Sequence, residues 1–100
     1  MENLSRLLSL LNSVLEEAGR EEAKAQDGDS RWDEGDIKNI VIPEMNRLKL
    51  HTERGEIWFP YGRKQRMLES TYLLTDSLNE LDHTSLGRKI LMLQDWINAS

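Results

Sequence analysis

The sequence predicts an all-α fold, in the form of an irregular antiparallel four-helix bundle. Apolar residues recur at intervals of three and four along most of the chain, which is the spacing of one helix face. The predicted helices are joined by short connections, which place sequential helices side by side and antiparallel. The 100 residues suffice for one hydrophobic core, so we expect a single helical domain over residues 1–100.

The first predicted helix begins near the N-terminus, where seven apolar residues from Leu4 to Ala18 share one helix face. Gly19 either ends this helix or is tolerated within it. The helix-favouring residues that follow, from Glu21 to Ala25, would carry the helix on toward Gln26.

Residues 26–35 are rich in Asp and Gly and predict a loop. Trp32 is expected to anchor this loop by folding back onto the bundle. The acidic residues do not match a calcium-binding loop. Counted from Asp27, Trp32 takes the place of the required glycine and Lys38 that of the bidentate glutamate. The sequence therefore predicts no metal site here.

The segment from Asp36 to His51 is ambiguous, because Pro43 interrupts a helical period. Proline lacks an N–H group and clashes with the carbonyl group four residues earlier. One solution, which we favour, is a helix from Asp36 to Thr52 that bends at Pro43. The other is a short extended piece followed by a helix with Pro43 at its first position.

A short extended aromatic crossover is predicted over residues 56–61, between the second and third helices. Pro60 favours extended geometry at Phe59, and Gly62 allows the chain to turn. The aromatic side chains of this segment can either fill the open end of the bundle or face a partner. Both interpretations remain open for Trp58, Phe59 and Tyr61.

The third helix is predicted over residues 63–81, with Met67 on its buried face and Tyr72 widening that face. Asp82 is predicted to be the N-cap of the last helix. The last helix has a buried seam with steps of four, three and four residues, typical of a bundle: Leu86, Ile90, Leu93 and Ile97.

The sequence gives little support to catalysis or cofactor binding. It contains no cysteine, which excludes disulfides, thiolate metal sites and cysteine nucleophiles. No nucleotide-binding or hydrolase motif occurs. The Glu-x-x-His spacing of Glu80 and His83 occurs once, whereas a di-iron bundle needs it twice. We therefore expect a non-enzymatic protein without a cofactor or metal ion.

Membrane insertion and secretion are not expected either. No apolar run approaches the roughly 18 residues of a membrane span. The N-terminus lacks the cationic and apolar regions of a secretory signal. The sequence therefore predicts a cytoplasmic protein.

Charge is unevenly distributed along this acidic chain, whose formal net charge is −5. Residues 47–66 carry more basic than acidic side chains, and residues 16–36 carry the reverse. The acidic side chains of residues 16–36 are Glu16, Glu17, Glu21, Glu22, Asp27, Asp29, Asp33, Glu34 and Asp36.

This pattern favours a small interaction or regulatory module that acts through a protein partner. Aromatic and arginine side chains dominate the energetics of protein interfaces. The predicted contact surface combines both kinds of side chain with one lysine: Arg54, Trp58, Phe59, Tyr61, Arg63, Lys64 and Arg66.

The alternative function is a nucleic-acid-binding regulator that uses the basic segment 63–66. The acidic total charge opposes phosphate binding, so the sequence favours a protein partner over nucleic acid.

The number of apolar residues is enough for a single core but leaves little margin for its stability. A homodimer that buries further apolar surface is therefore an alternative to a monomer.

Overall fold

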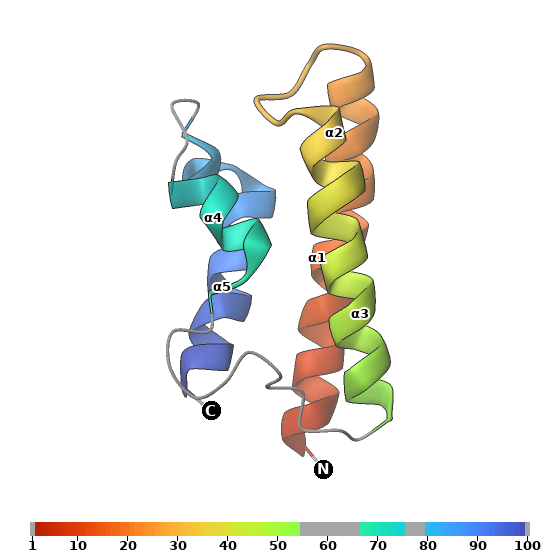
Figure 1. Ribbon diagram of the computed structural model, residues 1–100, viewed down its shortest axis with the longest axis vertical. Helices are drawn as coiled ribbons and strands as arrows, with labels where there is room; N and C mark the ends of the chain where they lie inside the picture. The colour runs from red at the N-terminus through yellow and green to blue at the C-terminus, as the bar shows by residue number, and fades with distance from the viewer. Residues whose placement is uncertain (1, 55–66, 76–79, 100) are drawn as a thin grey trace.

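The structure, a computed structural model, describes residues 2–54, 67–75 and 80–99 of the chain. These residues form four packed helical segments and no strand (Figure 1). The prediction of an all-α bundle is therefore confirmed, whereas the predicted crossover at 56–61 lies outside the described residues. The elements are α1 (Glu2–Gln26), α2 (Glu34–Asp36), the π-helical turn η1 (Ile37–Val41), α3 (Ile42–Glu53), α4 (Glu69–Thr75), the 3₁₀ turn η2 (Leu81–His83) and α5 (Ser85–Ala99).

The first helix, α1, is the element on which the others are assembled (Figure 1). α3 runs antiparallel to α1, α5 also packs along α1, and α4 lies against α5 and η1. α1 has 25 residues, about 37 Å at the usual rise of a helix, so it spans nearly the whole 40 Å length of the molecule. No helix among the described residues is long and apolar enough to cross a membrane.

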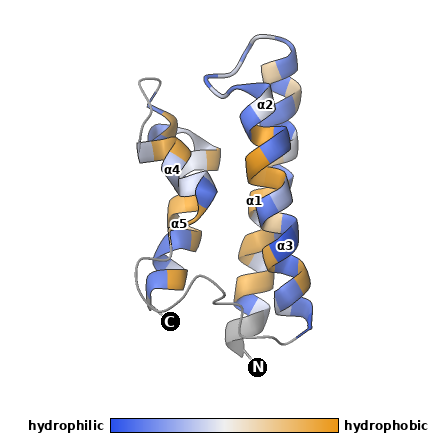
Figure 2. Ribbon diagram, viewed as in Figure 1, coloured by the Kyte–Doolittle hydropathy of each residue, from blue (hydrophilic) through white to orange (hydrophobic). Residues whose placement is uncertain are grey.

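The core contains the apolar faces that the periodicity predicts, while the loop joining α1 to α2 is hydrophilic (Figure 2). The predicted seam of the last helix is confirmed, because all four of its residues are buried. The buried apolar residues are Leu7, Leu11, Val14, Ala18, Trp32, Ile37, Val41, Met45, Leu48, Leu68, Leu74, Leu81, Leu86, Ile90, Leu93 and Ile97.

α1 continues through Gly19 and ends at Gln26, and the chain turns away at Gly28. Gly28 has a φ of +78°, a left-handed conformation that glycine adopts without steric cost. Its N–H donates to the Ala25 carbonyl at 3.1 Å, and the Asp29 N–H donates to the Lys24 carbonyl at 2.8 Å. This pair of bonds is the Schellman motif that commonly ends a helix.

The second helical segment is continuous from Glu34 to Glu53, and Pro43 is accommodated by a π turn. The Ile42 N–H donates to the carbonyl of Ile37, five residues earlier. This wider turn precedes the proline, whose ring would clash with the carbonyl of a regular turn. The favoured single helix is confirmed in its continuity, with bounds 34–53 in place of 36–52, while its bend at Pro43 stays a prediction. The alternative with an extended piece before Pro43 is wrong.

Trp32 anchors the loop after α1, as predicted. Its indole is buried, and its Nε1–H donates to the Thr84 hydroxyl oxygen at 3.0 Å. Near the same point, Arg31 forms an exposed ion pair with Glu80 at 3.6 Å. These two contacts hold the loop after α1 against the residues that immediately precede α5.

The third helix is shorter than predicted. Met67 and Leu68 precede α4 without being helical, and Leu81 lies in η2. Residues 63–66 and 76–79 are outside the described part of the chain. The prediction of one helix over 63–81 is therefore wrong, because residues 67 and 68 near its start and residue 81 at its end are not part of α4.

A buried carboxylate from α3 binds the start of α4. The Glu44 side chain accepts hydrogen bonds from the Glu69 N–H at 2.8 Å, the Ser70 N–H at 2.9 Å and the Ser70 hydroxyl at 2.7 Å. The first N–H groups of a helix have no partner within the helix. Glu44 supplies that partner, although it belongs to another helix.

Gln94 binds the same end of α4 from α5. Its amide oxygen accepts from the Leu68 N–H and from the Thr71 hydroxyl, both at 2.9 Å. Its amide nitrogen donates to the Asn98 side-chain oxygen at 3.1 Å. Side chains of two neighbouring helices thus determine where α4 begins.

The last helix is capped by Thr84, so the prediction that Asp82 is the N-cap is wrong. The Thr84 hydroxyl oxygen accepts the Gly87 N–H at 3.0 Å, and Thr84 has the extended backbone of an N-cap residue. Asp82 lies in η2, two residues earlier. A side chain at Gly87 would meet this turn, because an added Cβ would be 1.9 Å from the Leu81 carbonyl oxygen.

Two helical glycines, Gly87 and Gly19, should respond oppositely to alanine. Gly87→Ala forces its Cβ into the Leu81 backbone and should destabilise the fold by about 1–3 kcal/mol. Gly19→Ala adds a Cβ that meets nothing within 4 Å and should stabilise the fold by about 0.5–1 kcal/mol. Urea unfolding of both variants measures this difference. A Gly87→Ala variant as stable as the wild type would contradict the described turn.

Candidate partner-binding surfaces

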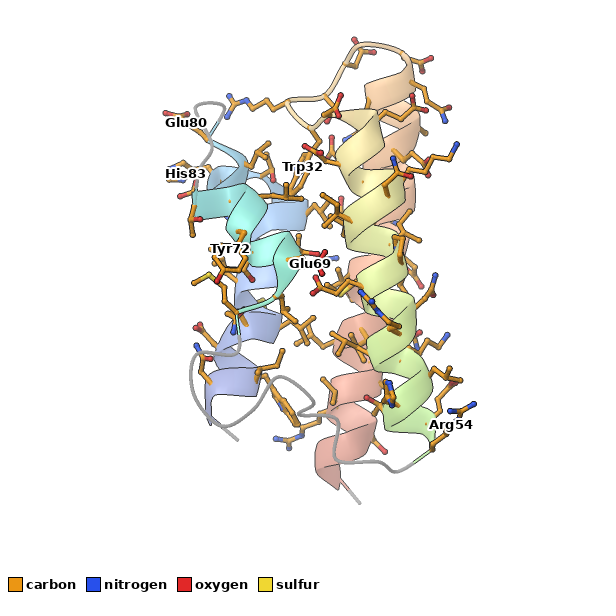
Figure 3. The ribbon with its side chains drawn as sticks, viewed as in Figure 1. Trp32, Arg54, Glu69, Tyr72, Glu80 and His83 are labelled. Carbon is orange, nitrogen blue, oxygen red and sulfur yellow. The ribbon has the colours of Figure 1, made fainter. Side chains whose placement is uncertain are left out.

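Arg54 is the one residue of the predicted contact surface that lies in the described part of the chain. It is exposed and projects from the end of α3, away from α4 and α5 (Figure 3). Trp58, Phe59, Tyr61, Arg63, Lys64 and Arg66 lie outside the described residues, so the surface predicted with them remains a prediction.

Two further exposed residues of α3 share the face of Arg54. Arg47 and Leu50 precede it by seven and four residues, which is the spacing of one helix side. Leu50 is 45% exposed, although leucine is usually buried. We name Arg47, Leu50 and Arg54 the α3 stripe.

A second group of exposed apolar residues, on α4 and α5 and just before α4, was not found by sequence reasoning. Tyr72 and Met92 are each 58% exposed, and Met67 and Leu91 are also exposed. The prediction that Met67 and Tyr72 belong to a buried helix face is wrong. We name Met67, Tyr72, Leu91 and Met92 the α4–α5 apolar face.

The reason why sequence reasoning missed these exposed residues differs between α4 and α5. On α4 the predicted buried face assumed a helix that starts at residue 63, whereas Glu44 and Gln94 set the start at Glu69. On α5 the signal was present in the sequence. Leu91 and Met92 fall outside the steps of the buried seam, and apolar residues in such positions must face solvent or a partner.

The ionisable groups with the most defined contacts support the fold. Glu17 lies at the contact of α1 with α5, where its carboxylate binds Arg20 at 3.0 Å and Lys89 at 3.3 Å. The hydrogen bond from Arg20 and then that from Lys89 lower the pKa of Glu17, while burial acts in the opposite direction. Within residues 2–54, 67–75 and 80–99, no group of three or more His, Asp or Glu side chains could hold a metal ion.

The histidines are separated in the structure. His83 is exposed in η2, where its Nε2 lies 3.9 Å from an Asp82 carboxylate oxygen. His51 is half-buried in the last turns of α3. The described geometry therefore does not bring them together as a pair of bases or ligands.

Comparison with known proteins gives no relative from which a role could be transferred. No protein-family model, curated protein or solved structure matches this chain. The candidate surfaces consequently rest on the residues themselves.

The Glu17 contacts predict a specific loss of stability in acid. A lowered pKa means that the unfolded chain takes up the Glu17 proton at a higher pH than the folded protein. The stabilisation is thus present above the ordinary glutamate pKa and is lost as pH falls through the folded pKa. Glu17→Gln should be less stable than wild type near pH 7, and this gap should narrow near pH 3.

Denaturant unfolding at both pH values measures the gap, with Glu16→Gln, an exposed neighbour, as the control. A stability difference between wild type and Glu17→Gln that is equal at the two pH values would contradict the claim that Arg20 and Lys89 lower the pKa of Glu17. The Glu16→Gln variant should show little difference from wild type at either pH.

Proposed function

We propose that this protein is a small non-enzymatic interaction module that acts through a protein partner. The observation that carries the proposal is the α4–α5 apolar face, where Tyr72 and Met92 are each 58% exposed. Exposed apolar side chains on neighbouring elements often mark interaction surfaces. Tyrosine is enriched at interface hot spots, and methionine adapts its shape to irregular partners.

The contacts of α4 add to this support. Glu44 and Gln94 bind the first turn of α4, and Tyr72 lies in the same turn. Figure 3 shows Tyr72 on the outward side of α4. A side chain presented from a fixed helix loses less conformational freedom on binding than one presented from a loop.

The proposal retains the surface predicted from the sequence, namely Arg54 with Trp58, Phe59, Tyr61, Arg63, Lys64 and Arg66. A protein partner that contacts this surface would be expected to carry complementary acidic groups. The homodimer alternative also remains, since a second copy could cover the α4–α5 apolar face. The alternative of nucleic-acid binding through residues 63–66 is tested by offering oligonucleotides to the same immobilised protein.

The α4–α5 apolar face should be required for partner capture. Immobilised wild-type protein and a Tyr72→Ser, Met92→Ser variant are incubated with a lysate of the native host, and retained proteins are quantified by mass spectrometry. The variant should keep its fold, because exposed substitutions usually change stability by about 0.5 kcal/mol or less. It should lose the proteins that the wild type retains.

The matched control is an Asn12→Ala, Gln26→Ala variant, which changes two exposed residues of α1. This control should retain the same proteins as the wild type. Equal capture by wild type and by the Tyr72, Met92 variant would place the interaction elsewhere. Retention of oligonucleotides that falls steeply with salt would favour the nucleic-acid function instead.

A further inference from the structure

Four exposed residues of α5 form a stripe on the side opposite its buried seam. At about 100° of rotation per residue, they lie within about 100° of one another around the helix axis. The two in the middle are apolar, with Met92 58% and Leu91 36% exposed, and the two at the ends carry opposite charges. We name Arg88, Leu91, Met92 and Asp95 the α5 stripe.

The other sides of α5 face the protein's own helices. Its seam is buried in the core. Gln94 binds α4 on one side of the stripe, and Lys89 binds the Glu17 carboxylate of α1 at 3.3 Å on the other side. Leu91 and Met92 are therefore apolar surface that no helix in the described part of the chain covers.

The two charges of the stripe have no evident role within one chain. Neither Arg88 nor Asp95 forms an ion pair with another described residue. Their positions do not favour the helix either. Cations stabilise the C-terminal end of a helix and anions its N-terminal end, whereas Arg88 is near the start of α5 and Asp95 is in its second half.

The order of residues in the α5 stripe is self-complementary. Arg88 lies three residues before Leu91, and Asp95 lies three residues after Met92. When two such helices pack antiparallel with Leu91 and Met92 at the centre, each arginine lies opposite the aspartate of the other copy. A two-fold dimer needs this kind of match, because the same surface patch meets itself. In a parallel pair each charge would face a like charge.

We propose that the α5 stripe binds a second copy of this chain, with the two α5 helices antiparallel across a two-fold axis. Leu91 packs against Met92 of the second copy, and two Arg88–Asp95 ion pairs flank this apolar centre. Tyr72 adds apolar area beside it, because α4 packs on α5. The inference rests on the proposed interaction role of the α4–α5 apolar face, and it identifies what covers that face.

Sedimentation equilibrium of the full chain tests the inference. The mass of the wild type should rise with protein concentration from 11.6 kDa, the mass of one chain, toward twice that value. Arg88→Asp and Asp95→Arg should each weaken dimerisation by at least about tenfold, because every charge of the stripe would then face a like charge.

An equimolar mixture of these two single variants should dimerise again, since the aspartates of one chain then face the arginines of the other. The double variant Arg88→Asp, Asp95→Arg should dimerise like the wild type for the same reason. Arg47→Asp, an exposed charge reversal on α3, is the matched control and should not change dimerisation. Circular dichroism checks that every variant is folded.

The inference is overturned if the wild type keeps the mass of one chain up to about 1 mM protein. It is also overturned if Arg88→Asp and Arg47→Asp dimerise equally well, or if the mixture of single variants does not regain dimers. A wild type that stays monomeric leaves the role of the α4–α5 apolar face to the capture experiment. That role fails only if the Tyr72→Ser, Met92→Ser variant retains the same proteins as the wild type, so the two failures are distinguishable.

Discussion

The buried carboxylate of Glu44 is the interaction on which the arrangement of the C-terminal half depends. Glu44 is 1% exposed, and its two oxygens accept three hydrogen bonds from Glu69 and Ser70. A buried charge without such partners would be strongly unfavourable, so Glu44 and the first turn of α4 require each other. The negative charge also lies at the positive end of the helix dipole.

This contact links the fold to the proposed function. α4 has seven residues, too few for a helix that is stable by itself in water. Glu44 from α3 and Gln94 from α5 bind its first turn, while Leu68 and Leu74 are buried in the core. These contacts leave Tyr72 on the outward side. The same helix α3 that supplies Glu44 presents the α3 stripe on its outer side, so one element positions both candidate surfaces.

The apolar periodicity of the sequence was sufficient to predict the buried residues where one helix buries one apolar stripe. It predicted the buried face of α1 and the seam of α5, because hydrophobic burial determines those positions locally. The anchoring role of Trp32 was predicted separately, from its place in a polar loop. Periodicity failed for α4 because the start of that helix is set by Glu44 and Gln94, which are distant in sequence. A signal for Glu44 did exist, since it interrupts the apolar stripe of α3, but its partner cannot be read from spacing. Thr84 was missed because η2 places the N-cap of α5 two residues later than the predicted Asp82.

Amide hydrogen exchange at Glu69 and Ser70 tests the role of Glu44 most directly. N–H groups in the first turn of a helix usually exchange quickly, because they have no acceptor within the helix. In wild-type protein both amides should be protected, and Glu44→Ala should remove their protection while amides in the middle of α1 remain protected. Rapid exchange of both amides in the wild type, or protection unchanged by Glu44→Ala, would contradict the claim that Glu44 holds α4 in place.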